Sequence, residues 1–438
     1  MNKIFRNRDF LSERRGKIFV EKISAESLAR KFGTPIYIYS ENRVRENARR
    51  VKSALAKFIP HLPTGQAGFE LFYAVKANNN LSVLSILRDE NLGADAAGPF
   101  EIELAKKAGF PREKILYSGV FHSDEELKFG LKSKIAVNVD SLSAATRLLK
   151  FGKPPLFSMR VNPGIAGGAI KKLVFAGPDA KFGENLANTI VAFRLAKKAG
   201  VRKFGLHMMT GSCVLDAEYF GAATEKLLKF AGEIRKKVGI EFEFIDIGGG
   251  LGIPYRANEK ILDIEKAIAK TAEIFSAGVA KFKLGNPKLM LEPGRFLVGD
   301  AGIILTRVGT VKKAAKTFVG VDAGMQTLLR PALYDAWHEI IVDGKLGRQN
   351  STKVSVVGPI CENTDQLARD RLLPRITEHD LLAILDVGAY GFGMASNYNT
   401  RARPAEILVS GNRAEIIRKH DGLAEIVGAQ KIPNRLQK

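Results

Sequence analysis

Two glycine-bearing turns in the second half of the chain could bind an anion. Gly248, Gly249 and Gly250 directly follow the apolar run FEFIDI (242–247), and the run that begins at residue 288 ends in Glu292-Pro293-Gly294-Arg295. Glycine lets backbone N–H groups approach an anion closely, and Arg295 adds a guanidinium. Gly-rich turns are also common as simple connections, but two of them after consecutive strand-like runs favour a bound phosphate group.

Lys76 ends another apolar run, in the sequence YAVKAN (73–78). A lysine in this position either extends to solvent or is held in a site, where burial lowers its pKa and makes the amine nucleophilic. An amine combined with a phosphate site is the arrangement needed for a Schiff base with pyridoxal 5′-phosphate, a phosphorylated cofactor that accepts electrons from its substrate. The combination therefore predicts this cofactor.

The elements that must position these residues alternate as in a parallel α/β fold. Amphipathic helical segments separate most of eight strand-like runs, which lie at 71–75, 92–97, 115–119, 135–140, 156–161, 203–209, 242–247 and 288–293. This rhythm predicts a (β/α)8 TIM barrel. Such barrels carry their chemistry at the carboxyl ends of the strands and often bind phosphate after strands 7 and 8, where both glycine turns lie.

After Arg295 the rhythm changes to closely spaced strand-like runs, which predict a β-rich second domain of sandwich or barrel type. These runs lie at 301–311, 316–322, 353–359, 381–388, 405–410 and 414–419. The early run PIYIYS (35–40) is expected to pair with them. We therefore predict an N-terminal segment at 1–45 that pairs with the β domain, a cofactor-binding barrel at 46–297 and a C-terminal β domain at 298–438. Segment 61–69, with Pro and Gly, is expected to be a surface loop.

Composition narrows the class of protein. The 438 residues are 45% hydrophobic and 26% charged, as in soluble globular proteins. The net charge is +22, but the cations are scattered along amphipathic segments, so a lysine-rich surface is favoured over specific nucleic-acid binding. No apolar stretch reaches the roughly 18 residues of a membrane span, and the N-terminus lacks the apolar run of a signal peptide. With only two cysteines, Cys213 and Cys361, a cytoplasmic location is expected.

Six motifs, in order and with compatible spacing over about residues 30–425, resemble those of the diaminopimelate decarboxylase family. They are YAVKAN, the triple glycine, EPGR (292–295), RPALYDAWHEI (330–340), GPICEN (358–363) and GAYGFGMASNYNTRARPAE (388–406). The resemblance implies a pyridoxal-phosphate barrel with a β domain, as in alanine racemase and eukaryotic ornithine decarboxylase. It implies conversion of meso-2,6-diaminopimelate to L-lysine and carbon dioxide, the last step of lysine biosynthesis, by a homodimer with shared active sites. No metal is expected.

The same resemblance implies roles for individual residues. Lys76 would form the Schiff base, Glu292 would pair with the pyridine nitrogen, and Cys361 would donate the proton that replaces carbon dioxide. The other implied cofactor contacts are Asp95, Ser212, Gly248, Gly249, Gly250, Gly294, Arg295 and Tyr390, and Glu101 would help Asp95 to orient the Lys76 region. The implied substrate-binding residues are Arg295, Arg330, Tyr334, Glu362 and Tyr390, with Glu362 binding the distal ammonium group.

The sequence departs from the family pattern at one motif. The family has His-x-His-x-Gly-Ser, whereas this chain reads His207-Met208-Met209-Thr210-Gly211-Ser212. Met209 thus occupies the position of the histidine that stacks on the cofactor, where a thioether can still contact the face of a ring. His207 is given no stacking role and is compatible with a hydrogen-bonded strand histidine.

Three other functions stay open. A sister decarboxylase could act on ornithine, arginine or a carboxylated polyamine, but Arg330 favours a second substrate carboxylate, which ornithine lacks. A catalytically silent regulator of the same fold would usually have lost the lysine or the proton donor, and this chain retains Lys76 and Cys361. A nucleic-acid binder is indicated by the net charge alone.

Overall fold

The computed structural model describes residues 5–437 except positions 6, 62, 63, 65–67, 165, 166, 169–175, 178 and 350. The chain forms two compact units. The barrel unit comprises Val44–Pro254 and Asn258–Gly299, and the β unit comprises Met1–Arg43, Tyr255–Ala257 and Asp300–Lys438. Most of the expected surface loop at 61–69 lies outside the described residues. Of the helices that are described, none is long and apolar enough to cross a bilayer.

Eight parallel strands close the barrel in the spatial order β11-β13-β14-β5-β6-β7-β8-β9. The predicted TIM barrel is confirmed, and each of the eight strand-like runs contributes one strand. The strands are β5 (Phe69–Ala74), β6 (Gly93–Ala96), β7 (Ile115–Ser118), β8 (Ala136–Val139), β9 (Phe157–Arg160), β11 (Phe204–His207), β13 (Phe244–Asp246) and β14 (Lys288–Leu291).

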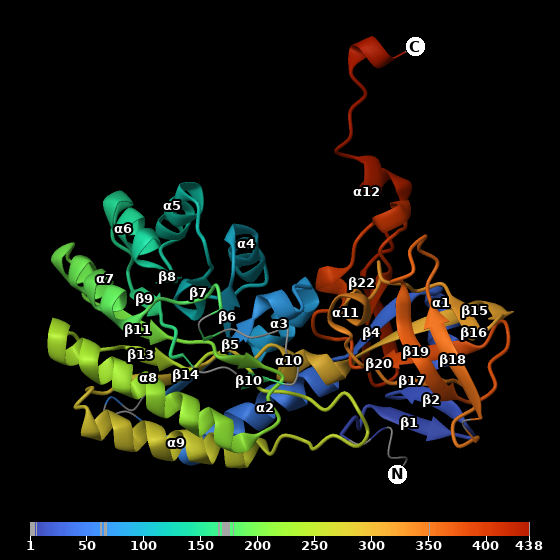
Figure 1. Ribbon diagram of the computed structural model, residues 1–438, viewed down its shortest axis with the longest axis horizontal. Coiled ribbons are helices and arrows are strands. Elements are labelled where there is room, and N and C mark those ends of the chain that lie inside the picture. The colour runs from blue at the N-terminus through green and yellow to red at the C-terminus, as the bar shows by residue number, and fades with distance from the viewer. Residues whose placement is uncertain are drawn as a thin grey trace. The chain divides into compact units, whose positions relative to one another are not determined.

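The barrel helices lie outside the strands, as Figure 1 shows for α4 to α9. Capping side chains mark the starts of several of them: Ser123 and Glu126 form a capping box at α5, and Asp263 accepts a hydrogen bond from the backbone of α9. The helices are α2 (Glu41–Phe58), α3 (Leu81–Asp89), α4 (Pro99–Lys107), α5 (Asp124–Ser133), α6 (Leu142–Phe151), α7 (Leu186–Lys198), α8 (Ala217–Val238) and α9 (Ile264–Lys281).

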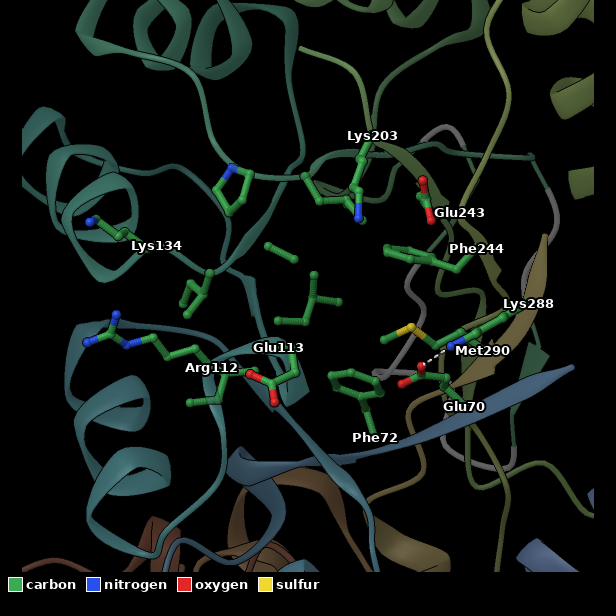
Figure 2. A pocket seen from close by; sticks show the side chains of 16 residues that line it. Glu70, Phe72, Arg112, Glu113, Lys134, Lys203, Glu243, Phe244, Lys288 and Met290 are labelled. Carbon is green, nitrogen blue, oxygen red and sulfur yellow. Dashed lines mark hydrogen bonds and ion pairs between the residues drawn. The ribbon is translucent and has the colours of Figure 1, made fainter. Parts of the chain in front are cut away.

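The amino ends of the barrel strands surround a cavity of about 390 Å³ (Figure 2). Its apolar wall includes Phe72 and Phe244, and charged side chains line its rim, among them the ion pair of Lys288 Nζ with Glu70 at 2.7 Å. The ring of Phe72 occupies the space beside Gly93, where a Cβ atom would lie 2.6 Å from the ring. No predicted site residue lines this cavity, so the predicted chemistry belongs to the opposite end of the strands.

The β unit is built on a nine-stranded sheet, which confirms the predicted β-rich domain. Strand β4 lies at its centre, antiparallel to β15 and parallel to β21. Ile36 and Ile38 of β4 point into one apolar cluster, and Tyr37 and Tyr39 point into another on the opposite face. The strands are β4 (Ile36–Ser40), β15 (Gly302–Lys313), β16 (Thr317–Val321), β17 (Ile340–Val342), β18 (Thr352–Val357), β19 (Gln366–Leu373), β20 (Leu381–Leu385), β21 (Ala405–Ser410) and β22 (Arg413–Arg418).

The N-terminal strands of the β unit were not predicted. Strands β1 (Leu11–Arg14) and β2 (Lys17–Val20) form a hairpin whose two turn residues, Arg15 and Gly16, both have positive φ. This is the backbone of a two-residue type I′ turn. The other described short elements are β3 (Ile23–Ser24), α1 (Ala25–Phe32), β10 (Gly167–Gly168), β12 (Gly211–Ser212), α10 (Arg295–Val298), α11 (Arg330–Tyr334) and α12 (Leu423–Val427).

Candidate active site

Lys76 and Asp95 form an ion pair at the carboxyl ends of two neighbouring strands. Lys76 lies in the 3-10 turn Val75–Ala77 that follows β5, and the pairing of Ala74 with Asp95 aligns the two strands. Lys76 Nζ lies 3.1 Å from Asp95 Oδ2, and the lysine side chain is 48% exposed whereas that of Asp95 is 1% exposed. Glu101 lies nearby on α4 and accepts a hydrogen bond from Ala97 N. The amine is therefore both accessible and held by a fixed anion.

Glu292 and His207 form a second, fully buried pair. Glu292 follows β14, and its Oε2 atom lies 3.1 Å from Nε2 of His207, the last residue of β11. The amide nitrogen of Asn138, on β8, lies 3.2 Å from His207 Nδ1. Because an amide nitrogen can only donate, Nδ1 accepts, and the ring proton is on Nε2. His207 therefore donates a hydrogen bond to Glu292.

Three buried carboxyl groups share this end of the barrel. Asp246, which ends β13, pairs in register with His207, and ligating atoms of His207, Asp246 and Glu292 all lie within 4.8 Å of one another. Burial and the charge of Glu292 raise the pKa of Asp246 well above its usual value and that of Asp95 to about 7. Burial acts to raise the pKa of Glu292 too, but His207 and Lys76 outweigh it and lower that pKa to about 2. Glu292 is thus the first of the three to ionise.

Arg160, the last residue of β9, supplies a buried cation beside these carboxyl groups. It pairs in register with His207, and its guanidinium lies 4.6 Å from the centre of the Phe182 ring. Burial lowers the pKa of Arg160 to about 10, although Glu292, Asp140 and Asp95 act to raise it. The arginine therefore remains charged at neutral pH and offsets part of the carboxylate charge.

The loops after β11, β13 and β14 meet where a phosphate was predicted. Arg295, at the start of α10, donates from Nη2 to Ser212 Oγ at 3.3 Å, and both side chains are buried. Gly248 and Gly250 have positive φ, which favours glycine. Two N–H groups of the triple glycine are used within the protein: Gly248 N donates to Asp246 Oδ1 at 2.7 Å, and Gly249 N donates to Met209 Sδ at 3.2 Å.

Met209, at the stacking position of the family motif, is therefore bound to the glycine turn. A Cβ atom at Gly248 would lie 3.0 Å from Met209 Sδ, so the thioether packs directly on the turn. The sulfur acts as a weak hydrogen-bond acceptor here. The N–H groups of Gly248 and Gly249, which were predicted to bind a phosphate, already have acceptors in the protein.

The β unit carries the other predicted residues. Arg330 begins α11, is 1% exposed and donates from Nη1 to His338 Nε2 at 2.8 Å. His338 Nδ1 donates to Leu385 O at 2.8 Å, so its Nε2 is an acceptor that orients the guanidinium. Tyr334, at the end of α11, is half-buried, and Tyr390 follows β20 with positive φ.

Cys361 and Glu362 are exposed on the loop between β18 and β19. Thr364 Oγ1 donates to Glu362 Oε1, and hydrogen bonds from Thr364 and Tyr398 lower the pKa of Glu362. The charge of Glu362 and its hydrogen bond raise the pKa of Tyr398 in turn. The structure thus brings Cys361, Glu362 and Tyr398 together, although Tyr398 lies 36 residues further along the chain than Glu362.

The residues at the barrel end fit pyridoxal 5′-phosphate. A side-chain hydrogen bond with Asp246 also acts on Glu292 and helps to lower its pKa. The buried Oε1 atom of this ionised carboxylate can accept from the ring nitrogen of the cofactor. The accessible amine of Lys76 can reach an aldehyde, and Ser212 with Arg295 offers donors to a phosphate.

Sequence reasoning missed several residues that the fold places at the site. Asn138, Arg160 and Asp246 each interrupt or end an apolar strand run with a polar side chain, which was an available signal. His338 and Tyr398 lie inside quoted motifs and were given no role. Tyr398 lies far in sequence from its partner Glu362, whereas His338 contacts Arg330 within the same motif.

Comparison with known proteins defines the class. Residues 42–299 match the family model described as the pyridoxal binding domain of pyridoxal-dependent decarboxylases. Together with the closed barrel and its terminal lysine, this match makes the chain a pyridoxal-phosphate-dependent decarboxylase by class.

Full-length relatives define the family. The chain is 42% identical to the diaminopimelate decarboxylase of Methanothermobacter thermautotrophicus over 97% of this chain and 98% of that protein. It superposes on the diaminopimelate decarboxylase of Methanocaldococcus jannaschii in complex with L-lysine with a TM-score of 0.88, at 32% identity, covering 98% of this chain and 100% of that chain. The L-lysine complex of the Helicobacter pylori enzyme gives a TM-score of 0.83 at 32% identity, covering 92% and 98%. The chain belongs to the diaminopimelate decarboxylase family.

Proposed function

We propose that the protein decarboxylates meso-2,6-diaminopimelate to L-lysine and carbon dioxide with pyridoxal 5′-phosphate. The observation that carries this proposal is the placement of the Lys76–Asp95 and His207–Glu292 pairs at the carboxyl ends of one closed barrel. Full-length similarity to diaminopimelate decarboxylases supports the choice of substrate.

The residues of the barrel unit would bind the cofactor and adjust its electronics. When bound, pyridoxal 5′-phosphate withdraws the electron pair that the departing carboxylate leaves behind. Lys76 would hold the cofactor covalently through its accessible amine, with Asp95 keeping that amine in place. Ionised Glu292 would accept a hydrogen bond from the ring nitrogen and keep it protonated, because a nearby anion favours the charged form of a base.

The phosphate group would lie at the turns after β11, β13 and β14. Ser212 and Arg295 offer a hydroxyl and a guanidinium. We assign the backbone of Gly250 and Gly294 as further donors, and Tyr390 as a hydroxyl donor. Gly248 and Gly249 would act mainly by shape, because their N–H groups donate to Asp246 and Met209.

Residues of the β unit would select the substrate and complete the reaction. Arg330 would bind a substrate carboxylate together with Tyr334, and Arg295 would contribute from the barrel. Glu362 would bind the distal ammonium, since its ionised form is favoured by Thr364 and Tyr398. Cys361 would give its Sγ proton to the carbon that has lost carbon dioxide. A thiol suits this step because its ordinary pKa of about 8.5 lets it carry a proton at neutral pH.

The working form would be a homodimer in the cytoplasm. Both cysteines are free, which suits a reducing compartment. Light scattering of the eluting protein would test the dimer, and a monomeric mass in a fully active sample would contradict it.

The deciding experiment offers the purified protein, with pyridoxal 5′-phosphate, to meso-diaminopimelate and separately to ornithine, arginine and lysine. We expect carbon dioxide and L-lysine from diaminopimelate alone. Release from ornithine or arginine would assign a sister decarboxylase instead. A Schiff base without carbon dioxide from any substrate would indicate a silent relative.

A further inference from the structure

We propose that His207, fixed by Asn138, is a positioning residue that keeps Glu292 ionised and leaves its Oε1 atom directed at the ring nitrogen of the cofactor. This inference rests on the role proposed above for Glu292. It gives His207 a function separate from the stacking position of the same motif, which Met209 occupies.

The geometry fixes the tautomer of His207 and the direction of the hydrogen bonds that run from Asn138 through His207 to Glu292. His207 is 1% exposed, and each ring nitrogen has one partner. Asn138 Nδ2 also lies 2.8 Å from Ser118 Oγ, so the amide is held from two sides. With Nδ1 accepting from Asn138, the only proton that neutral His207 can give is on Nε2, and Glu292 Oε2 receives it.

His207 acts together with Lys76 and Asp246, which also lower the pKa of Glu292. Asp246, Asp95, Arg160, Lys76 and His207 all act on Glu292 or on its neighbouring carboxyl groups. Ligating atoms of Asp246 and Glu292 lie within 4.8 Å of each other, and two buried carboxyl groups this close disfavour each other's ionised form. A hydrogen bond given to Oε2 favours the ionised form of Glu292 over that of Asp246. Without the donor, Glu292 would be more readily protonated and could no longer keep a pyridine nitrogen charged.

Met209 and His207 contact different parts of the barrel end. The sulfur of Met209 accepts from Gly249 N in the glycine turn, whereas Nε2 of His207 lies 3.1 Å from Glu292 Oε2. The proposed role of His207 therefore does not depend on the residue at the stacking position.

The test compares two ligands of the full-length apoenzyme: pyridoxal 5′-phosphate, and its deaza analogue in which CH replaces the ring nitrogen. Both carry the same aldehyde and phosphate, so only contacts to the ring nitrogen distinguish them. Four variants are compared by equilibrium titration: His207→Leu, His207→Gln, Asn138→Leu and Glu292→Gln. Glutamine extends an N–H donor to about the position of Nε2 and serves as the rescue variant.

For His207→Leu we expect binding of the natural cofactor to weaken about 10- to 100-fold, the range of a lost hydrogen bond to a charged group. The deaza analogue should change less than about threefold, His207→Gln should recover most of the loss, and Asn138→Leu should show a smaller loss. If His207→Leu weakens the binding of both ligands equally, or of neither, the proposed action of His207 on Glu292 is overturned and His207 is a packing residue. If Glu292→Gln does not discriminate between the ligands, the assignment of Glu292 itself fails. Should His207→Leu not fold, the milder His207→Gln and Asn138→Leu variants still give the comparison.

Discussion

Lys76 Nζ and Asp95 Oδ2 lie 3.1 Å apart, with the lysine half exposed and the aspartate fully buried. The arrangement is asymmetric: Asp95 cannot move to solvent, whereas the amine can leave the ion pair to react. In the role proposed for Lys76, the amine could react with a carbonyl group while Asp95 stays in place, because only the lysine has to reorient. The pair is the basis for the first two predictions.

Replacing Lys76 with alanine should abolish covalent attachment of the cofactor. After borohydride reduction, mass analysis of the wild-type protein should find one pyridoxyl group on residue 76 and that of the variant none. The decarboxylation rate should fall by about three orders of magnitude or more, as when a covalent catalyst is removed. Lys114→Ala is a matched control, since Lys114 pairs with Glu70 at the amino ends of the strands. An adduct on another lysine of the active wild-type protein would refute the assignment.

In the Asp95→Asn variant, the free energy of unfolding of the apoprotein should decrease less as the pH rises than it does in the wild type. Burial, followed by the charge of Glu292, raises the pKa of Asp95 from 3.8 to about 7, so the folded state prefers the protonated form. The free energy of unfolding therefore decreases by at most about 4 kcal/mol as the pH rises from about 4 to about 7. Urea denaturation at pH 5 and pH 8 should show a smaller difference for the variant than for the wild type. Identical pH profiles would mean that Asp95 ionises normally in the fold.

His122→Phe should protect the barrel unit against mild acid. His122 is 3% exposed, its ring packs edge-on against Tyr117 with centroids 5.0 Å apart, and burial lowers its pKa to about 4. Since the unfolded chain takes up the proton near pH 6.5, stability is lost as the pH falls from about 6.5 to about 4, by at most about 3 kcal/mol.

Phenylalanine keeps the ring and removes the titration, so the unfolding free energy of the variant should change less between pH 7 and pH 5 than that of the wild type. The opposite order, with the variant more sensitive to acid, would show that His122 is protonated and paired in the fold.

Cys361→Ser should slow the reaction without affecting cofactor binding. A hydroxyl is a far weaker acid than a thiol, so proton delivery should become about 100- to 10,000-fold less efficient. Steady-state rates with diaminopimelate would measure this. Cys213→Ser is the control, because Cys213 is buried and its thiol lies 3.5 Å from Ile253 O. Equal rates in the two variants would remove Cys361 from the mechanism.

Arg330→Ala should raise the KM for diaminopimelate about 10- to 100-fold, the effect of losing a charged hydrogen bond to a carboxylate. Cofactor affinity, measured by titration in the same variant, should change far less. Because Arg330 is buried against His338, the variant should also be less stable, and the assay temperature must lie below its unfolding transition. A KM equal to that of the wild type would favour a substrate with one carboxylate.

The order of strands and helices could be predicted because each of them has a local pattern of apolar residues. Each barrel strand is a short apolar run followed by a helical segment, and each predicted run became a strand. The hairpin at Leu11–Val20 was not predicted, although Arg15-Gly16 is a recognisable turn. Its two strands have only four residues each, so they carry little of an alternating apolar pattern. Strand β19 was missed because its charged residues, such as Arg369 and Asp370, interrupt the apolar pattern on its exposed face.

The chemistry was predictable where a single residue type carries it. Lys76 could be predicted from its place at the end of an apolar run together with a phosphate site, whereas the roles of Glu292 and Cys361 are implied by the family resemblance and stay predictions. Asn138 and Arg160 gave a weaker signal, since a polar residue within a strand or at its end can also be an ordinary structural residue.

The sequence by itself thus determined the barrel and the cofactor class, and it predicted which groups react. Tertiary structure alone decided which groups act on one another: His207 on Glu292, Met209 on Gly249, and Tyr398 on Glu362. The physical reason is that hydrogen bonds and charge interactions depend on distances of a few ångströms. Closing the barrel and forming the sheet bring together residues that are far apart in the chain, and neither composition nor local periodicity records those distances.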